Sequence, residues 1–411
     1  MDVSKYFRFL SFMVLISANL PVVFFNLPSY IKSHHIWTFV WITSLFVFNF
    51  KVFQHKHLSF ILIYGFLIIV ILLNTIWVNI DGWNKHQIRM EFYEILVASS
   101  VIIYYRISQD YYGLALLIKW TIICILITAM LSIVTSYINP NYARDIIGAD
   151  LLASSMEYQK TLSFQKYGGG GYSFASALVC LFPLFIYYLK NNEKSLWKKK
   201  TLLLGIVLLF YTLLRLQLFA NILVSLAIIV FSILGTRNIY YSSFVFVIML
   251  LIIILIPIQY YVDGLRFAGS WFNPNSEVYY KFNDMANFLI RGGSFEGTGI
   301  GHRAERYPLL WESFSSNPLF GGKYWNGHLH WMNKLAVYGL IGTIPFFIIL
   351  FNFIKLNLSF FDKEFSYYFL LSISSILILG SMKTLGGREL WYTYFIIVPG
   401  LYYLPLLKKQ T

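Results

Sequence analysis

Long runs of apolar residues, separated by short polar segments, follow one another along the whole chain. The hydrocarbon core of a bilayer needs about 20 apolar residues per crossing helix. The first run follows Lys5 and Arg8 and is followed by no small-residue cleavage site, so we interpret it as a retained span. The pattern predicts an all-α polytopic membrane protein with about 12 transmembrane helices, at 8–27, 36–53, 58–80, 92–105, 113–138, 171–189, 201–216, 218–234, 240–262, 335–354, 366–381 and 391–407.

The apolar stretch 201–234 is interrupted in its middle by Arg215 and Gln217. A single helix over this stretch would bury the arginine deep in the membrane, at a cost of roughly 2.5–3.5 kcal/mol or more. Two short helices, with Arg215 at the tip of a tight hairpin between them, avoid that cost. We therefore predict a hairpin here.

Twelve spans place both termini on one side of the membrane and the long segments 139–170 and 263–334 on the other. Sixteen of the 32 Lys and Arg residues lie on the side of the termini, and seven of the others lie in 263–334. Loops longer than about 60 residues are left out of the positive-inside rule, so the comparison is sixteen against nine. It predicts cytoplasmic termini and long extracytoplasmic loops. The chain then divides into 1–262 with nine spans, the large loop 263–334, and 335–411 with three spans.

The large loop is predicted to be partly helical. Apolar residues recur at helical spacing over about 276–290, and a second amphipathic stretch runs over about 304–315. Pro308 within the second stretch indicates a helix start or a break. We expect these helices to lie on the membrane surface.

The composition excludes a soluble enzyme, because 58% of the residues are hydrophobic and only 12% are charged, against about 45–50% and about 25% in soluble domains. The net charge of +14 would indicate nucleic-acid binding in a soluble protein. Here cytoplasmic anchors explain half of the basic residues, so no nucleic-acid partner is predicted. Cys124 and Cys180 lie inside apolar runs and are interpreted as buried hydrophobic residues. No metal-ligand spacing is found, and no metal or cofactor is predicted.

Arginines and histidines gather toward the end of the large loop, where Arg303 and Arg306 precede His328 and His330. The arginine fork binds phosphate groups bidentately. A neutral histidine can accept a proton from a sugar hydroxyl. Each residue alone is most simply a solvated loop charge, but together they indicate a site for an anionic substrate.

The segment NPLFGGKYWNGHLHWMNKLAVYGLIGTIPFF resembles the signature of the bacterial O-antigen ligase and polysaccharide polymerase family. Members show an Asn/Arg-Pro-Leu-hydrophobic-Gly turn, then a histidine, then ten residues before a Gly-hydrophobic-hydrophobic-Gly start of a span. Here these are 317–321, His328 and 339–342, with His330 as the second candidate histidine. The usual Asn after the family histidine is Leu329 in this chain.

Further features agree with the family pattern. Arg303 lies fifteen residues before Pro318, as a family arginine does, and Arg215 fits the family arginine of an outside hairpin. The local sequence around Arg215 lacks the usual Ser-Arg-Gly. The glycine-rich segment YGGGGYSFA, at 167–175, is similar to the family's glycine-containing start of a span.

The resemblance implies a fold like that of type C glycosyltransferases. It implies transfer of a glycan from undecaprenyl diphosphate to a sugar hydroxyl at the outer face of the bacterial plasma (inner) membrane, by an inverting, metal-independent displacement. Expected partners are the lipid-linked oligosaccharide, membrane lipid, a chain-length regulator and a flippase. The implied catalytic residues are His328, Arg215 and Arg303, and the implied diphosphate- or glycan-binding residues are Arg306, Arg266, His330 and Gly321.

The sequence leaves three functions open. A polymerase would transfer the growing O-antigen or capsule chain to a lipid-linked repeat unit, and this is the function that we favour. A ligase would transfer the finished chain to lipid A core. A flippase or secondary transporter would instead need ionisable residues in mid-membrane and broken helices in both halves, whereas the predicted spans are nearly free of charge.

Overall fold

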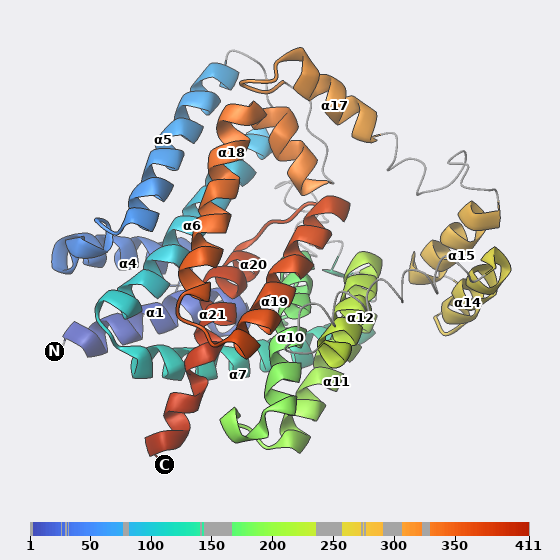
Figure 1. Ribbon diagram of the computed structural model, residues 1–411, viewed down its shortest axis with the longest axis horizontal. Coiled ribbons are helices and arrows are strands. Elements are labelled where there is room, and N and C mark those ends of the chain that lie inside the picture. The colour runs from blue at the N-terminus through green and yellow to red at the C-terminus, as the bar shows by residue number, and fades with distance from the viewer. Residues whose placement is uncertain are drawn as a thin grey trace.

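The chain folds into a bundle of helices that runs from the N-terminal α1 to the C-terminal helical segment (Figure 1). The structure is a computed structural model, and all the elements in the residues that it describes are helical. Those residues are 3–25, 27–28, 31, 33–76, 82–139, 142–143, 167–235, 257–272, 274, 277–290, 306–322 and 329–410.

The described residues before 240 form two groups of helices. The first is α1 (Val3–Asn19), α2 (Pro21–Phe25), α4 (His34–Phe48), η1 (Phe50–Val52), α5 (Lys56–Ile76), α6 (Gly82–Ile107) and α7 (Tyr111–Ile138). The second is α10 (Tyr172–Lys190), η2 (Asn192–Lys194), α11 (Lys199–Leu216) and α12 (Phe219–Leu234).

The rest of the chain forms the helices of the large loop and a C-terminal group. The loop carries α14 (Ile258–Ser270), α15 (Glu277–Ile290) and α17 (Arg306–Ser316). The C-terminal group is α18 (His330–Leu358), α19 (Lys363–Met382), α20 (Arg388–Tyr392), η3 (Thr393–Ile397), α21 (Val398–Gly400) and η4 (Leu401–Gln410).

Within the described residues, five helical segments are long and apolar enough to cross a membrane, judged by length and composition. Three shorter apolar helices accompany them, at His34–Phe48, Lys56–Leu67 and Phe219–Leu234. Every predicted span except 240–262 coincides in its main part with described helices, whereas most of 240–262 lies outside the described residues. The number of twelve crossings therefore stays a prediction. The five long segments are Tyr111–Ile138, Tyr172–Lys190, His330–Leu358, Lys363–Met382 and Arg388–Lys408.

The predicted hairpin at Arg215 is confirmed. Helix α11 ends at Leu216, Gln217 has a left-handed backbone with φ of 55°, and α12 begins at Phe219. Arg215 occupies the last turn of α11, where a cation interacts favourably with the negative end of the helix dipole. Its charged group is thus at the end of two apolar helices and not within them.

The core is built around α10, which packs against α11, α12, α19 and α20 (Figure 1). Its side chains are buried from Phe174 to Tyr188, which fits a helix that is apolar on all faces. Peripheral helices instead expose large apolar side chains, such as Phe39 on α4 at 67% and Phe66 on α5 at 70%. A surface of this kind is stable against lipid tails and costly in water.

The helices of the large loop agree with the expected pattern. Helix α15 covers the predicted amphipathic stretch 276–290, and α17 has Pro308 in its first turn, where proline is tolerated. Helix α14 runs across the predicted boundary between span and loop at 262. Figure 1 shows α14 and α15 beside each other at one edge of the bundle, and the ring of Phe282 meets that of Phe219 on α12 with centroids 4.9 Å apart.

Candidate functional site

Several helices begin around the connection 383–387 that joins α19 to α20. The amide of His330 at the start of α18 donates to the carbonyl of Lys383 over 3.2 Å, and the hydroxyl of Tyr307 in α17 donates to the carbonyl of Ser381 over 2.9 Å. The hydroxyl of Ser173, in the first turn of α10, donates to the carbonyl of Gly386. The predicted topology places this end of the bundle, hereafter the outer end, on the extracytoplasmic side.

Lys383 is deeply buried at the outer end, with 2% of the residue exposed. Its Nζ donates to Ser176 Oγ of α10 over 2.8 Å and to Asn221 Oδ1 of α12, and lies 3.9 Å from the ring centroid of Tyr172. Among the described residues it forms no ion pair. Burial lowers the pKa of Lys383 well below its ordinary value, so an anion beside it would stabilise the protonated amine.

Arg215 lies at the tip of the α11–α12 hairpin and packs against the end of α7. Its guanidinium lies over the ring of Tyr137, 4.0 Å from the centroid, and its Nε donates to Ser136 Oγ over 3.0 Å. One turn earlier on α7, Ser132 Oγ accepts a bond of 2.8 Å from the amide of Gly170. Arg215 therefore lies at the same end of α7 as the glycine-rich start of α10.

The hairpin that carries Arg215 also carries a residue that binds Lys383. Asn221, in the first turn of α12, accepts from Lys383 and donates through Nδ2 to Ser176 Oγ over 3.3 Å. Arg215 and Asn221 are six residues apart, on the two sides of the same tight turn. Arg215 thus lies on one side of this turn, and the residue that binds Lys383 lies on the other side.

Two largely buried carboxylates on α6 lie one turn apart and bind partners on different helices. Glu91 contacts Lys334 Nζ at 2.6 Å and His330 Nε2 at 3.3 Å, both from the start of α18. Because all three side chains are largely buried, this ion pair is shielded from water and is stronger than a surface pair. The group connects α6 to α18.

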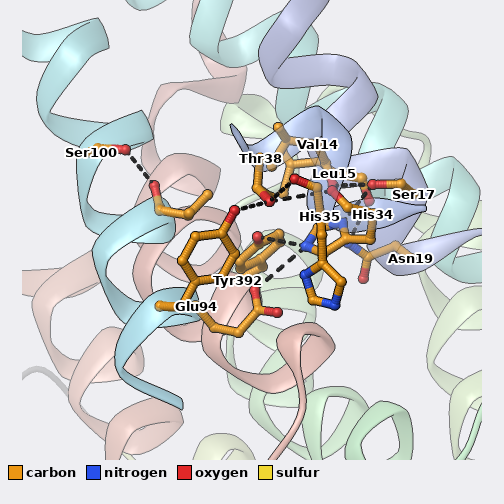
Figure 2. A network of polar contacts seen from close by, with 12 residues as sticks. Val14, Leu15, Ser17, Asn19, His34, His35, Thr38, Glu94, Ser100 and Tyr392 are labelled. Carbon is orange, nitrogen blue, oxygen red and sulfur yellow. Dashed lines mark hydrogen bonds and ion pairs between the residues drawn. The ribbon is translucent and has the colours of Figure 1, made fainter. Parts of the chain in front are cut away.

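The second carboxylate, Glu94, belongs to a network that Figure 2 shows in close view. His34 Nε2 lies 3.5 Å from Glu94 Oε2 and is hydrogen-bonded to the hydroxyl of Tyr392 at 2.9 Å. On its other side, His34 Nδ1 is hydrogen-bonded to Ser17 Oγ at 2.6 Å. The network joins α1, α4, α6 and α20, and it satisfies both ring nitrogens of His34.

Two segments of the motif that resembles the family signature bind each other through their backbones. The amides of Leu340 and Ile341 donate to the carbonyls of Pro318 and Leu319, over 2.9 and 3.1 Å. Gly339 has φ of +57°, and a Cβ atom there would lie 2.4 Å from the carbonyl oxygen of Leu319. The helix α18 kinks at this glycine. We call the paired segments 317–322 and 336–342 the glycine clasp.

Gly321 lies within the clasp, and its position explains why the motif has glycine there. Its φ is +82°, and a Cβ atom would lie 2.2 Å from the carbonyl oxygen of Val337. Only glycine adopts this conformation without strain and allows so close an approach. The amide of Gly322 then donates to the carbonyl of Ala336 over 2.6 Å. The clasp thus holds residues 317–322 against the first half of α18.

The other predicted site residues have different surroundings. Arg306 begins α17 next to Tyr307, and its Nη1 is buried without a hydrogen-bond partner in the described part of the chain. His330 is buried with Glu91 and is not open to a substrate. Arg266 is exposed on α14, and no hydrogen bond or ion pair connects it to the other candidates among the described residues. His328 and Arg303 lie outside the described residues.

Sequence reasoning did not identify Lys383, Glu91, Glu94 or His34 as members of polar clusters. One signal was present, because Glu91 directly precedes, and Glu94 lies at the start of, the predicted span 92–105, which is unusually short. A helix that begins at Gly82 takes both carboxylates into the bundle. Within the described residues no group of three or more His, Cys, Asp or Glu side chains could hold a metal ion.

Comparison with known proteins adds no relative. The chain matches no protein-family model, and no curated protein is similar to it. Function is therefore argued from the sequence motif and from the outer end of the bundle.

Proposed function

We propose that the protein is a polysaccharide polymerase that transfers a glycan from undecaprenyl diphosphate to a lipid-linked repeat unit. The reaction takes place at the outer face of a bacterial plasma membrane, with both termini cytoplasmic and the segments 139–170 and 263–334 outside. A fold with about 12 spans, like that of type C glycosyltransferases, is part of this proposal. The observation that supports it best is the glycine clasp.

The clasp supports the proposal because it gives the residues of the short motif a structural role. A chance similarity of five residues to a family turn requires no contact with a second motif 18 residues later. In this chain 317–321 and 339–342 are hydrogen-bonded, and the two glycines with positive φ lie where the segments meet. The motif is thus one structural unit, and its two halves flank His328 in the sequence.

The proposed reaction is a direct displacement at the anomeric carbon of the donor sugar. The acceptor hydroxyl oxygen forms the new bond to this carbon, while the bond from carbon to phosphate oxygen breaks and undecaprenyl diphosphate leaves. His328 accepts the proton of the acceptor hydroxyl. Arg215 and Arg303, with Arg306 and Arg266 assisting, stabilise the negative charge that develops on the leaving diphosphate.

The structure offers support for part of this arrangement. Arg215 is held at a hairpin tip at the outer end by Ser136 and Tyr137, so its guanidinium is positioned before a substrate arrives. The buried and unpartnered Nη1 of Arg306 provides a donor that no described residue uses. Arg215 and Arg306 both lie at helix ends. An anionic group at the bilayer surface reaches them there at the lowest cost of bringing a charge into the bundle.

A defined assay tests the proposal. Purified protein in nanodiscs is incubated with a synthetic undecaprenyl-diphosphate-linked repeat unit, and the products are separated by length. The wild-type chain is expected to produce a ladder, whereas Arg215→Ala and His328→Ala, each present at the wild-type level, are expected to lose at least about a hundredfold in rate. Lys355→Ala, an exposed lysine at the opposite end of α18, is the control. Full activity in either site variant contradicts the assignment of that residue.

A flippase is the second candidate, and the buried charges favour it. Ionisable groups inside the bundle, such as Glu91, Lys334 and Glu94, are typical of transport pathways. Each of these charges has a partner, however, which equally fits a structural role. A deletion strain separates the functions by its glycans: single repeat units on lipid A core indicate a polymerase, long chains left on the carrier indicate a ligase, and units trapped inside indicate a flippase.

A further inference from the structure

We propose that Lys383, together with the helix starts around it, forms a binding site for a phosphate group of a membrane lipid. If the proposed function is right, this phosphate belongs to the diphosphate of the lipid-linked donor. The proposal assigns to Lys383, at the α19–α20 connection, a binding role that the motif of the large loop does not predict.

The first argument is that Lys383 has no counter-charge beside it among the described residues. A lysine that is 2% exposed in an apolar bundle is expected to have a carboxylate partner, as Lys334 has in Glu91. Among the described residues the ammonium of Lys383 instead has only the neutral oxygens of Ser176 and Asn221 and the ring of Tyr172. These groups orient the ammonium but supply no full negative charge.

The second argument is the set of helix starts that meet this lysine and its connection. Helices α10 and α12 begin here with no side-chain cap on their first amides, whereas the first amide of α18, that of His330, already donates to the carbonyl of Lys383. The start of a helix carries a partial positive charge and free amide donors, and together these favour an anion. Arg306 begins a fourth helix, α17, whose neighbouring Tyr307 bonds to Ser381, and its buried Nη1 has no partner in the described residues.

A purely structural role for Lys383 would be to cap the carbonyl end of α19. The geometry does not support that role, because other groups donate to those carbonyls. Tyr307 donates to the carbonyl of Ser381, and the amide of His330 donates to the carbonyl of Lys383 itself. The ammonium of Lys383 is directed instead to α10 and α12, at Ser176 and Asn221.

Two variants separate binding from folding. Lys383→Met removes the charge but keeps the length of the side chain. Asn221→Asp keeps the lysine and places a carboxylate on its ammonium, so the fold gains an ion pair while the site loses its affinity for anions. Lys383→Arg keeps a positive charge, and Lys355→Met is the control at the exposed inner end of α18.

The experiment measures binding of two probes to the full chain in phosphatidylcholine nanodiscs, by native mass spectrometry. The probes are undecaprenyl diphosphate and phosphatidylglycerol. We expect Lys383→Met and Asn221→Asp each to weaken binding of undecaprenyl diphosphate at least about tenfold, with Lys383→Arg and Lys355→Met close to the wild-type chain. Asn221→Asp is expected to unfold at a higher temperature than the wild-type chain.

The outcomes distinguish this inference from the proposed function. Wild-type affinity in both Lys383→Met and Asn221→Asp overturns the site, and if Lys383→Met does not fold, Asn221→Asp decides alone. A loss confined to phosphatidylglycerol supports a phosphate site but overturns its assignment to the donor. A wild-type chain that binds undecaprenyl diphosphate through Lys383 and yet forms no glycan ladder contradicts the polymerase while leaving the binding site in place.

Discussion

At the scale of single residues, the ion pair between Glu91 and Lys334 makes a prediction about stability. Removing one member of a buried pair leaves the other charge without compensation, at a cost of about 3–5 kcal/mol. Glu91→Gln and Lys334→Met are therefore each expected to lower the unfolding temperature strongly. The double variant Glu91→Gln/Lys334→Met leaves no unpaired charge there and is expected to recover much of the loss.

The measurement is thermal unfolding followed by size-exclusion chromatography of the detergent-solubilised protein. The exposed pair of Lys194 and Asp362, at 3.1 Å, provides the control, because such surface pairs contribute only about 0–1 kcal/mol. Lys194→Met should therefore leave the unfolding temperature nearly unchanged. Single variants at Glu91 and Lys334 that are as stable as the control would show that the contact contributes little.

Residues differ in how far their surroundings follow from the sequence. The position of Arg215 was predictable, because the cost of a charge inside an apolar run forces a break in the helix next to it. The partner of Glu91 was not, because Lys334 lies 243 residues away and no local pattern connects them. The same holds for His34 and Tyr392, which are 358 residues apart.

At the scale of elements, the glycine clasp predicts what a single methyl group does to α18. Gly339→Ala places a Cβ atom 2.4 Å from the carbonyl oxygen of Leu319 and forces a residue with a side chain to φ of +57°. A strained backbone of this kind costs about 1–3 kcal/mol. We expect the clasp to open, the unfolding temperature to fall and, under the proposed function, the glycan ladder to disappear.

Gly264 is the matched control for this variant. It lies inside α14, and a Cβ atom there would meet nothing within 4 Å. Gly264→Ala is expected to be neutral or slightly stabilising, because alanine favours the helix by about 1 kcal/mol. If Gly339→Ala behaves like Gly264→Ala in both stability and activity, the contact between 317–322 and 336–342 is not formed as described.

The elements also show where hydrophobic pattern stops being informative. The hydrophobic pattern located the helices, because an apolar run in lipid must satisfy its own backbone hydrogen bonds. It placed the start of α6 at residue 92, since residues 82–91 are mostly polar, yet the helix begins at Gly82. It likewise placed a span start at residue 335, although α18 begins at His330 and kinks at Gly339. Tertiary contacts decide such ends, and the pattern does not record them.

At the scale of the whole molecule, the predicted orientation depends on which side of the membrane each end of the bundle occupies. Introduced cysteines test it, because the two native ones are both buried. Ser270, exposed at the end of α14, belongs to the outside loop in this topology, whereas Ser359, exposed between α18 and α19, belongs to the cytoplasmic side. The two positions lie at opposite ends of the predicted bundle.

We expect a membrane-impermeant maleimide to label Ser270→Cys in intact spheroplasts and Ser359→Cys only after permeabilisation. The physical reason is the excess of Lys and Arg on the side of the termini, sixteen against nine outside the large loop. The wild-type chain, with Cys124 and Cys180 buried, sets the background. The reverse labelling pattern would place the outer end, with Arg215 and Lys383, in the cytoplasm. A glycan donor exposed only on the opposite face could then reach neither cation, so this experiment decides whether the proposed reaction is geometrically possible.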